Sequence, residues 1–528
     1  MRDGRLIRVV LLLGGVCTLA LGSGGAAGGE RDGEAARAPA RPSQNRLQQR
    51  PNVVVLMTDD QTLESLRVMR NVDRLLARRG ATFTRSVVSF ALCCPSRATF
   101  LTGQYAHNHR VLSNLAPRGG YGRLDHSTTL PVWLRRGGYH TVHVGKHLNG
   151  YGLTRPREVP PGWSEWYGAV DPSTYRYWNF TVNENRRLVR YRRRSDYQTD
   201  VFARRAVEVI RRRAPKRQPF FLYVGFVAPH SGGPRELDDP PSLKTPAPAP
   251  RHRDRFLFEP LPSPPSFNEA DVQDKPVTVR RRPMLREFQL GALTEAYQQQ
   301  LESLLAVDEA VARVVKALRR AGDLEKTLII MTSDNGYFHG EHRIPSGKVF
   351  VYEPATRVPL IIRGPRIAPG QRIDDLVANI DLAPTIADAA NVTALRIMDG
   401  RSLLPLLEKG IRPTAPRSIL IESPPSDVPR QVFAAVRTQQ YLYASYESGD
   451  QELYDLQADP YQLASVHRDP GQAALVAELS LRLEELQSCA GVSCRTAPAP
   501  AARPPAGEST AERSGTRSAG DAPRARGP

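Results

Sequence analysis

The residues in this chain that could do chemistry most directly are Cys93-Cys94-Pro95-Ser96-Arg97, followed closely by Leu101-Thr102-Gly103. We expect this segment to begin a helix, with a sulfur atom and a fixed cation in its first turn. Helix N-termini bind anions because their free N–H groups and the positive end of the dipole point outward. The alternative is a buried pair of thiols at an ordinary helix start, and the residue types alone leave both interpretations open.

Polar side chains follow four apolar, strand-like runs of the chain. These runs are residues 53–57, 141–144, 220–227 and 328–331. The polar residues that follow them are, in the same order, Asp59 and Asp60, then Lys146, then His230, then Asp334 and Asn335. Strands that alternate with helical patterns predict βαβ units and a parallel sheet. Ligands bind at the carboxyl ends of such strands, so we expect all four groups to meet at one edge.

The elements between these strands are predicted from periodicity. Residues 66–79 read as a helix that ends at Gly80. A longer helix ends near Gly322 and carries an apolar face made of Leu301, Leu304, Leu305, Val311, Val314, Val315 and Leu318. Residues 229–283 are rich in Pro and basic residues, which indicates a long irregular excursion over the surface.

Four of the polar residues are hard oxygen donors. Asp59, Asp60, Asp334 and Asn335 together could surround Ca²⁺ or Mg²⁺, which both prefer carboxylate and amide oxygens. Each pair taken alone is more simply a solvated turn, because Asp and Asn are common there.

The pattern C-x-P-S-R-x-x-x-L-T-G that starts at Cys93 resembles the signature of type I sulfatases, which are formylglycine-dependent members of the alkaline-phosphatase-like superfamily. Further stretches resemble the family: Gly347-Lys348, Asp381-Leu382-Ala383-Pro384-Thr385, Asp399-Gly400-Arg401-Ser402-Leu403 and Glu452-Leu453-Tyr454-Asp455-Leu456. The resemblance covers roughly residues 51 to 495. It implies an α/β fold, with a large mixed β-sheet flanked by helices and a smaller C-terminal antiparallel-sheet subdomain.

The resemblance also implies a cofactor and a metal. Cys93 would be oxidised to formylglycine (3-oxoalanine) by a formylglycine-generating enzyme during maturation. Calcium, with Mg²⁺ less expected, would be held by the four oxygen donors and by residue 93. One hydroxyl of the hydrated aldehyde would attack sulfur and leave a covalent sulfate ester, and the second hydroxyl would then expel sulfate.

Basic residues would offset the charge of the sulfate group and of the leaving oxygen. By resemblance, Arg97 holds the geometry of the aldehyde and metal, and Lys146 and Lys348 contact sulfate oxygens. His230 would bind the substrate and protonate the leaving alcohol. For each of these residues alone, a solvated lysine or a structural histidine is the simpler interpretation.

The substrate is inferred from a branch of the family. Gly145-Lys146-His147-Leu148-Asn149 departs from the common Lys-x-His pattern and looks closer to N-acetylglucosamine-6-sulfatases and heparan endosulfatases, as does the adjacent Cys-Cys. This implies a sulfated amino sugar or glycan, such as N-acetylglucosamine 6-sulfate, and leaves the role of His147 open. The alternatives are an arylsulfatase or phosphonate/phosphodiester hydrolase of the same fold, and an unmodified polyanion-binding protein.

Composition sets the remaining expectations. The 528 residues carry a formal net charge of +19, with 40% hydrophobic and 24% charged residues. This composition is globular, and the charge gives weak support for an anionic substrate, since no nucleic-acid-binding signature accompanies it. Cys489 and Cys494 fit a small disulfide loop in an oxidising compartment, although two free thiols are the alternative.

We predict five segments along the chain. Residues 1–30 read as a signal peptide, with Arg2, Arg5 and Arg8 before an apolar run that is short for a membrane span. We therefore expect a secreted, extracellular protein. A linker over residues 31–50, a catalytic domain over 51–415, a C-terminal α+β subdomain over 416–495 and a disordered tail over 496–528 complete the division.

Overall fold

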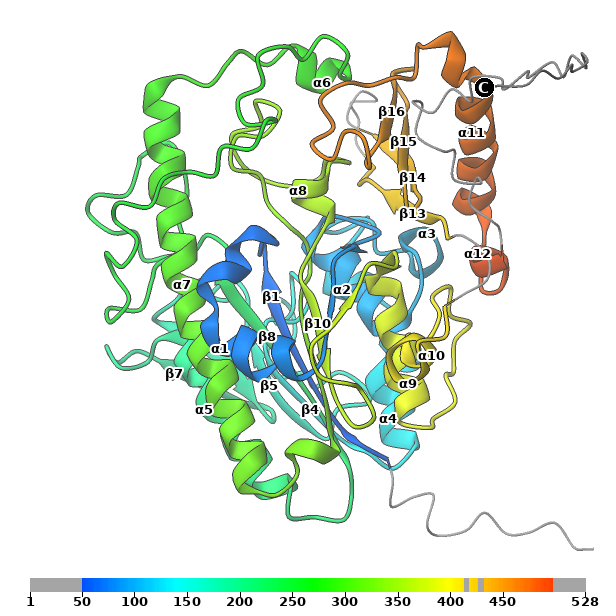
Figure 1. Cartoon of the computed structure of the whole chain (residues 1–528). Helices are drawn as coiled ribbons and strands as arrows, with labels where there is room; N and C mark the ends of the chain where they lie inside the picture. The colour runs from blue at the N-terminus through cyan, green and yellow to red at the C-terminus, as the bar shows by residue number, and fades with distance from the viewer. Residues whose placement is uncertain (1–49, 413–416, 426–431, 497–528) are drawn as a thin grey trace, which may run out of the picture. The chain divides into compact units, whose positions relative to one another are not determined.

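The computed structural model describes residues 50–412, 417–425 and 432–496. Within them, a ten-stranded mixed sheet forms the centre of the fold (Figure 1). Its strands are, in spatial order, β11 (Gln371–Ile373), β2 (Ala81–Phe83), β10 (Leu360–Arg363), β9 (Thr327–Ser333), β1 (Asn52–Asp59), β8 (Phe220–Pro229), β4 (His140–Gly145), β5 (Glu165–Ala169), β6 (Phe180–Glu184) and β7 (Arg187–Tyr191). The five strands from β9 to β5 are mutually parallel, and antiparallel strands flank them on both sides.

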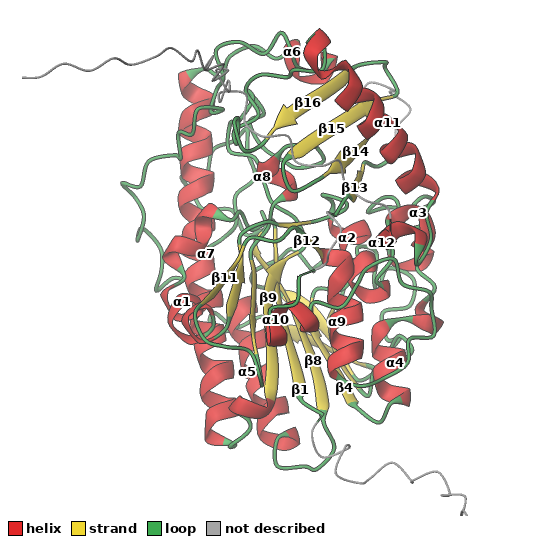
Figure 2. Ribbon diagram, turned by 45° about the vertical axis from the view of Figure 1, so that its right-hand side comes forward, coloured by secondary structure: helices red, strands yellow, loops and turns green. Residues whose placement is uncertain are grey.

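The central strands are buried on both faces because helices cover the sheet on either side (Figure 2). One face packs against α1 (Arg70–Leu75), α5 (Gln198–Arg213) and α7 (Glu287–Arg320). The other packs against α2 (Cys93–Thr102), α4 (Leu130–Arg136), α9 (Leu382–Ala389) and α10 (Leu404–Lys409). Alternate residues of β1 enter the two cores, with Val54 in one and Val53 in the other, which explains why this parallel strand is continuously apolar.

A smaller antiparallel sheet follows towards the C-terminus. The described residues of this region form four strands in the order β13 (Ile419–Glu422), β14 (Phe433–Arg437), β15 (Tyr441–Tyr446) and β16 (Gln451–Asp455). Helix α11 (Ala473–Ser488) packs on it and is followed by α12 (Ser493–Thr496). The predicted fold class, a large mixed sheet with helices and a small antiparallel sheet, is confirmed.

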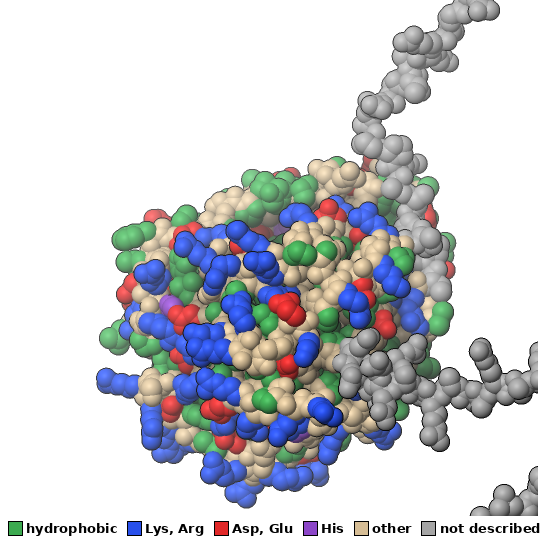
Figure 3. Space-filling model, turned by 60° about the horizontal axis from the view of Figure 1, so that its bottom comes forward, with side chains coloured by type: hydrophobic (Ala, Val, Ile, Leu, Met, Phe, Trp, Pro, Cys, Tyr) green, Lys and Arg blue, Asp and Glu red, His purple; other side chains and the backbone are tan. Residues whose placement is uncertain are grey.

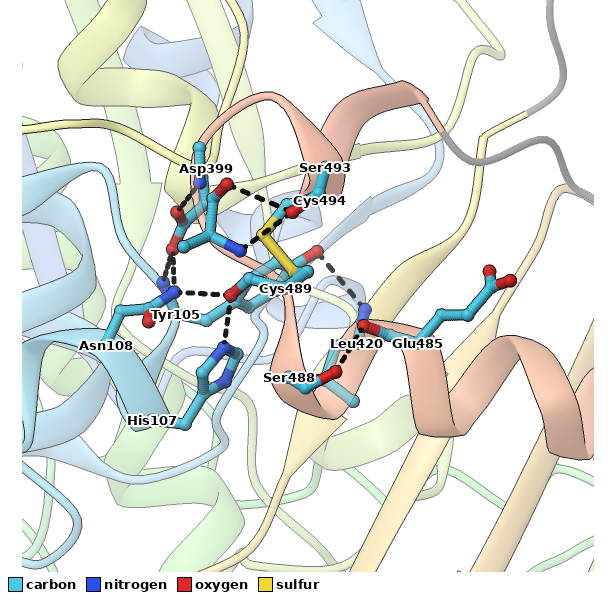
Figure 4. The surroundings of a disulfide bond; sticks show 12 residues. Tyr105, His107, Asn108, Asp399, Leu420, Glu485, Ser488, Cys489, Ser493 and Cys494 are labelled. Carbon is cyan, nitrogen blue, oxygen red and sulfur yellow. Dashed lines mark hydrogen bonds between the residues drawn. A yellow bond between two sulfur atoms is a disulfide. The ribbon is translucent and has the colours of Figure 1, made fainter.

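Cys489 and Cys494 are joined by a disulfide bond at the end of this region (Figure 4). The loop that they close contacts two segments that lie far before it in the chain. His107 and Asn108 of α3 (Ala106–His109) each contact the Cys489 carbonyl oxygen at 2.9 Å, and the Asp399 carboxylate accepts a hydrogen bond of 2.7 Å from the Gly491 N–H.

The predicted strands are present and the long helix is longer than predicted, but the predicted helix over 66–79 is broken. In its place stand a 3₁₀ turn at Glu64–Val68, the six-residue α1, and a second 3₁₀ turn at Ala77–Arg79. The carboxylate of Asp308, on α7, accepts hydrogen bonds from the N–H groups of Asn71 and Val72. It therefore satisfies two free donors at a new helix start, an interaction with α7 that the local periodicity could not reveal.

The predicted excursion after β8 is irregular from His230 to Pro276, and the short helix α6 (Val277–Arg280) follows it. The short helix α8 (Glu353–Thr356) and the two-stranded pairing of β3 (Ser86–Val87) with β12 (Val377–Ala378) complete the elements of the described chain that concern the site. In the described ranges, no helix combines the length and apolar character needed to span a bilayer. The predicted signal peptide, and nearly all of the linker and tail, lie outside the described residues.

Candidate active site

The carboxyl ends of four neighbouring parallel strands bring the predicted polar residues together. Strand β1 ends at Asp59 and lies between β8 and β9, with Met57 opposite Gly225 on one side and Thr58 opposite Ser333 on the other. His230 directly follows β8, and Asp334 directly follows β9. This adjacency confirms that the four strands deliver their polar groups to one edge of the sheet.

Helix α2 brings Cys93 to this edge. The helix begins at Cys93, and the preceding residue, Leu92, is extended and provides no side-chain cap. The Cys94 N–H is satisfied instead by the Asn114 side chain at 2.8 Å. The Cys93 sulfur lies 3.4 Å from Asp59 Oδ1, and Lys348 Nζ donates to it at 3.0 Å. The helix start and the strand edge thus form one site.

Two lysines neutralise Asp59, the last residue of β1, and Asp60, which follows it. Lys146 forms an ion pair with Asp59, and Lys348 forms one with Asp60. Burial alone would raise the pKa of Asp59, but the surrounding cations, of which Lys146 contributes most, hold this pKa well below its usual range. Burial alone would lower the pKa of both lysines, yet the aspartates keep each lysine pKa well above its ordinary value. Asp59 and both lysines are therefore charged near neutral pH.

Arg97, one turn along α2, ties the helix to the strands. Its Nε donates to Asp334 Oδ2 at 2.7 Å, and its Nη1 donates to the Tyr223 hydroxyl at 3.0 Å and to the Lys146 carbonyl at 3.2 Å. Its side chain is only 1% exposed. A Cβ on Gly225 would lie 2.3 Å from the Lys146 carbonyl oxygen and 3.1 Å from Arg97 Nη1. Only glycine at this position of β8 permits so close an approach.

His230 faces the same group of side chains. Its Nδ1 lies 2.7 Å from the Ser231 carbonyl oxygen, which can only accept, so Nδ1 carries the proton of the neutral ring. Its Nε2 points towards Asp60, 3.6 Å from Oδ2. Burial lowers the pKa of His230, although Asp60 and Asp59 oppose the shift.

The donor set fits a divalent cation. One ligating atom from each of Asp59, Asp60, Cys93 and His230 lies within 4.8 Å of the others. The buried Oδ1 of Asn335 has no hydrogen-bond partner within the described chain, while its Nδ2 donates to Asp60 Oδ1 at 2.6 Å. A buried acceptor without a partner is costly, and a cation beside these carboxylates would satisfy it.

The structure brings the predicted residues together with two differences. Asp334 does not belong to that compact group. Its Oδ2 accepts a hydrogen bond from Arg97, and its Oδ1 accepts one of 3.3 Å from the Asp60 N–H. Burial, with the charge of Asp59, raises the pKa of Asp334 to about 6. His230, which the sequence predicted as a proton donor, does belong to the group.

The unmodified thiol of Cys93 is a poor nucleophile in this setting. Burial, reinforced by the negative charge of Asp59, raises its pKa to about 11. The reactive form of a cysteine is the thiolate, and less than a thousandth of the thiol would ionise at neutral pH. The site favours chemistry other than that of a cysteine thiolate.

Sequence reasoning missed three residues that shape the site. The Tyr175 ring lies between Lys146 Nζ, 4.7 Å from its centroid, and the His230 ring, at 4.4 Å. Tyr223 supports Arg97, and Asn149 contacts the Cys94 sulfur. Asn149 could have been found, because it ends the Gly-Lys-His-Leu-Asn motif, but the tyrosines carry no local signal.

His147 is placed away from Cys93. Its ring packs edge-on against His143 and Trp166, each about 5.1 Å away, in a buried aromatic cluster. Burial, and then the neighbouring His143 and His126, hold its pKa well below the usual value. In the described structure, the ring contacts of His147 are with this aromatic cluster.

Comparison with known proteins identifies the class of enzyme. Residues 51–392 match the family model described as Sulfatase, and residues 340–489 match the model described as N-sulphoglucosamine sulphohydrolase, C-terminal. The chain therefore belongs to the sulfatase family, and it is a sulfuric ester hydrolase.

Individual relatives agree with this assignment. The chain is 34% identical to the N-acetylglucosamine-6-sulfatase of Homo sapiens over 85% of this chain and 86% of that protein. It is 35% identical to the extracellular sulfatase SULF-1 homolog of Drosophila melanogaster over 73% of this chain and 34% of that protein. A solved structure in complex with its substrate D-glucosamine-2-N,6-O-disulfate superposes with a TM-score of 0.69 at 24% identity, covering 83% of this chain and 97% of that one. This last likeness shows the shared fold.

Proposed function

We propose that this enzyme hydrolyses the sulfate ester of an amino sugar or related glycan, with the 6-O-sulfate of N-acetylglucosamine as the leading substrate. The observation that carries the proposal is the position of Cys93, at the start of α2 between Asp59 and Lys348, where four strand ends meet. The extensive likeness to the human N-acetylglucosamine-6-sulfatase supports the choice of sugar.

We further propose that Cys93 is converted to formylglycine by a formylglycine-generating enzyme, since its C-x-P-S-R-x-x-x-L-T-G pattern resembles the sulfatase signature and its unmodified, buried thiol would be a poor nucleophile. The hydrated aldehyde supplies an oxygen nucleophile with a second hydroxyl on the same carbon, so release of sulfate needs no additional water attack. Asp59, Asp60, Asp334 and Asn335, together with residue 93, would hold Ca²⁺, which supplies a positive charge beside the sulfate group.

The remaining residues of the site have roles that follow from their positions. Lys146 and Lys348 offset the charge of the sulfate oxygens, since both ammonium groups are held beside Asp59 and Asp60. Arg97 fixes α2 against Asp334 and so orients residue 93. Nε2 of His230 faces the site, and in the imidazolium form, which carries a second proton on Nε2, it would protonate the leaving alcohol.

We also propose that the protein acts outside the cytoplasm. The apolar segment near the N-terminus favours export, and one of the relatives is named an extracellular sulfatase. A disulfide bond in the described structure suits an oxidising compartment.

A mass measurement and an assay test the proposal. Conversion of Cys93 to formylglycine lowers the mass of its peptide by about 18 Da, as a thiol becomes an aldehyde. The converted protein is expected to release sulfate from N-acetylglucosamine 6-sulfate and from 4-nitrophenyl sulfate, and Cys93→Ala is the matched inactive control. Faster turnover of matched phosphate or phosphonate esters would replace the proposed substrate. An unmodified Cys93 in active protein would contradict the proposed nucleophile.

A further inference from the structure

A cavity of about 490 Å³ adjoins the proposed active site and shares a residue with it. Lys348 lines the cavity and also lies 3.0 Å from the Cys93 sulfur. The other lining residues that matter here are Arg281, Arg282, Phe350, Phe433 and Tyr446. The volume falls in the range of small-ligand sites. A substrate larger than one sugar could therefore extend from the nucleophile into this cavity.

Two arginines give the cavity a positive charge that the protein does not neutralise. Within the described chain, no carboxylate lies within ion-pair distance of Arg281 or Arg282. Their neighbour Arg280 differs, because it is paired with Asp450 at 2.8 Å. Burial lowers the pKa of Arg282, as expected for a guanidinium partly removed from water without an acidic partner. An anionic group of a ligand would provide that partner.

Aromatic side chains form the rest of the cavity wall. The Arg282 guanidinium lies over the Phe350 ring, 5.4 Å from its centroid, and its Nε donates to the Thr278 carbonyl at 2.9 Å. Phe433 and Tyr446, from β14 and β15, lie with ring centroids 5.5 Å apart. Apolar ring faces beside a few fixed polar groups are typical of small-ligand sites.

The wall that carries the arginines is fixed to the C-terminal sheet. Asp450, in the turn between β15 and β16, accepts hydrogen bonds from the Val277 N–H at 3.1 Å and from Arg280. Lys275 donates to the Leu463 carbonyl at 2.6 Å. The end of the long excursion is thus anchored where it faces Lys348, so the backbone that carries both arginines is held in place before a ligand arrives.

We propose that this cavity is a subsite for the sugar next to the one that carries the scissile ester, and that Arg281 and Arg282 bind an anionic group of that sugar. The inference rests on the proposed function and deepens it, since it makes the preferred substrate a charged oligosaccharide rather than a single sugar. A sulfate and a carboxylate would offer the arginines the same chemistry.

The test compares three disaccharides with the monosaccharide N-acetylglucosamine 6-sulfate. The disaccharides carry the same 6-sulfated sugar beside a sulfated, a carboxylated or an uncharged neighbour. For each, kcat/KM is divided by that of the monosaccharide, with the wild-type chain and with the double variant Arg281→Gln/Arg282→Gln. The wild-type ratio is expected to be highest for a charged neighbour, and the sulfated and carboxylated arms show which anion is preferred. The double variant should lower that ratio by about ten- to a hundredfold, because hydrogen bonds to charged groups are lost.

The matched control is Arg217→Gln, which removes one exposed arginine before the start of β8, at the end of that strand opposite His230. This control should leave the ratio unchanged. Arg282→Lys keeps a positive charge in the cavity and should therefore keep part of the ratio that the double variant loses. An equal ratio in the wild type and the double variant, or no preference for a charged neighbour, would overturn the subsite.

A binding experiment separates this inference from the proposed function. Calorimetric titration of the full-length Cys93→Ala chain with each disaccharide needs no turnover. The double variant in this background is expected to weaken binding of the charged disaccharide by a similar factor. Loss of affinity without any wild-type sulfate release would contradict the proposed function and keep the subsite. Sulfate release by the wild type, with unchanged affinity in the double variant, would support the proposed function and contradict the subsite.

Discussion

Replacement of Arg97 by methionine probes how the site is held together. The guanidinium is 1% exposed and neutralises Asp334, whose carboxylate is completely buried. Methionine has a similar length and fills much of the same space, but it leaves Asp334 without its cation. Breaking one side of a buried ion pair costs about 3–5 kcal/mol, since the remaining charge stays out of water. We expect Arg97→Met to lower the free energy of unfolding by up to that amount, because burial already raises the pKa of Asp334 to about 6 and its carboxyl can take up a proton once the guanidinium is gone.

The assay is urea denaturation followed by circular dichroism, in buffer with a chelator and in buffer with Ca²⁺. Tyr223→Phe is the matched control, because it removes one neutral hydrogen-bond partner from Arg97 and leaves both charges. It should cost about 1 kcal/mol. The double variant Arg97→Met/Asp334→Asn no longer has a carboxylate without a partner. Its free energy of unfolding should therefore fall by less than the sum of the losses in Arg97→Met and Asp334→Asn, with a difference of roughly 0.5–3 kcal/mol.

Two results would refute this reasoning. A loss below about 1 kcal/mol for Arg97→Met would mean that water or a bound cation compensates Asp334 as well as arginine does. Strict additivity in the double variant would mean that the two side chains do not interact in solution.

Three further predictions concern other parts of the molecule. Burial raises the pKa of Glu302 to about 7 from 4.5, so the folded state holds an extra proton between these values. The free energy of unfolding should therefore fall by up to roughly 3 kcal/mol as pH rises through this window, and Glu302→Gln should flatten the profile measured by urea denaturation. The double variant Cys489→Ser/Cys494→Ser should lose about 2 kcal/mol, as expected for a short cross-linked loop, with reduction of the wild type as the comparison. His230→Ala should lower kcat/KM for N-acetylglucosamine 6-sulfate by about 10²- to 10⁴-fold but far less for 4-nitrophenyl sulfate, whose leaving group needs no proton; equal losses on both substrates would argue against His230 as the acid.

Many of the positively charged side chains lie far from the proposed active site, where they would not contact a substrate. Figure 3 shows many Lys and Arg side chains, with fewer acidic ones, on the face at the lower end of Figure 1, where the amino ends of β1, β8 and β4 lie. The active-site residues lie at the opposite ends of these strands. Net charge therefore says little about the substrate, whereas the two unpaired arginines beside Lys348 are informative because of their position.

The sequence by itself determined which residue types meet at the site. Continuous apolar runs before Asp59, Lys146, His230 and Asp334 predicted parallel strands, because a strand buried on both faces is apolar throughout. They also predicted a shared edge, because the carboxyl ends of parallel strands lie on the same side of the sheet. The motif that begins at Cys93 predicted the helix start and the family, which the comparisons confirmed.

Only the tertiary structure decided which side chains contact each other across these elements. The break in the helix predicted over 66–79 depends on Asp308, more than 200 residues away along the chain, and the support of Arg97 by Tyr223 depends on β8 lying beside β1. In the sequence, Arg281 and Arg282 read as ordinary surface charges, and only the fold shows that they line one cavity with Lys348. Local sequence encodes the propensity and burial of each element, but contacts between distant side chains arise only once the whole chain has packed.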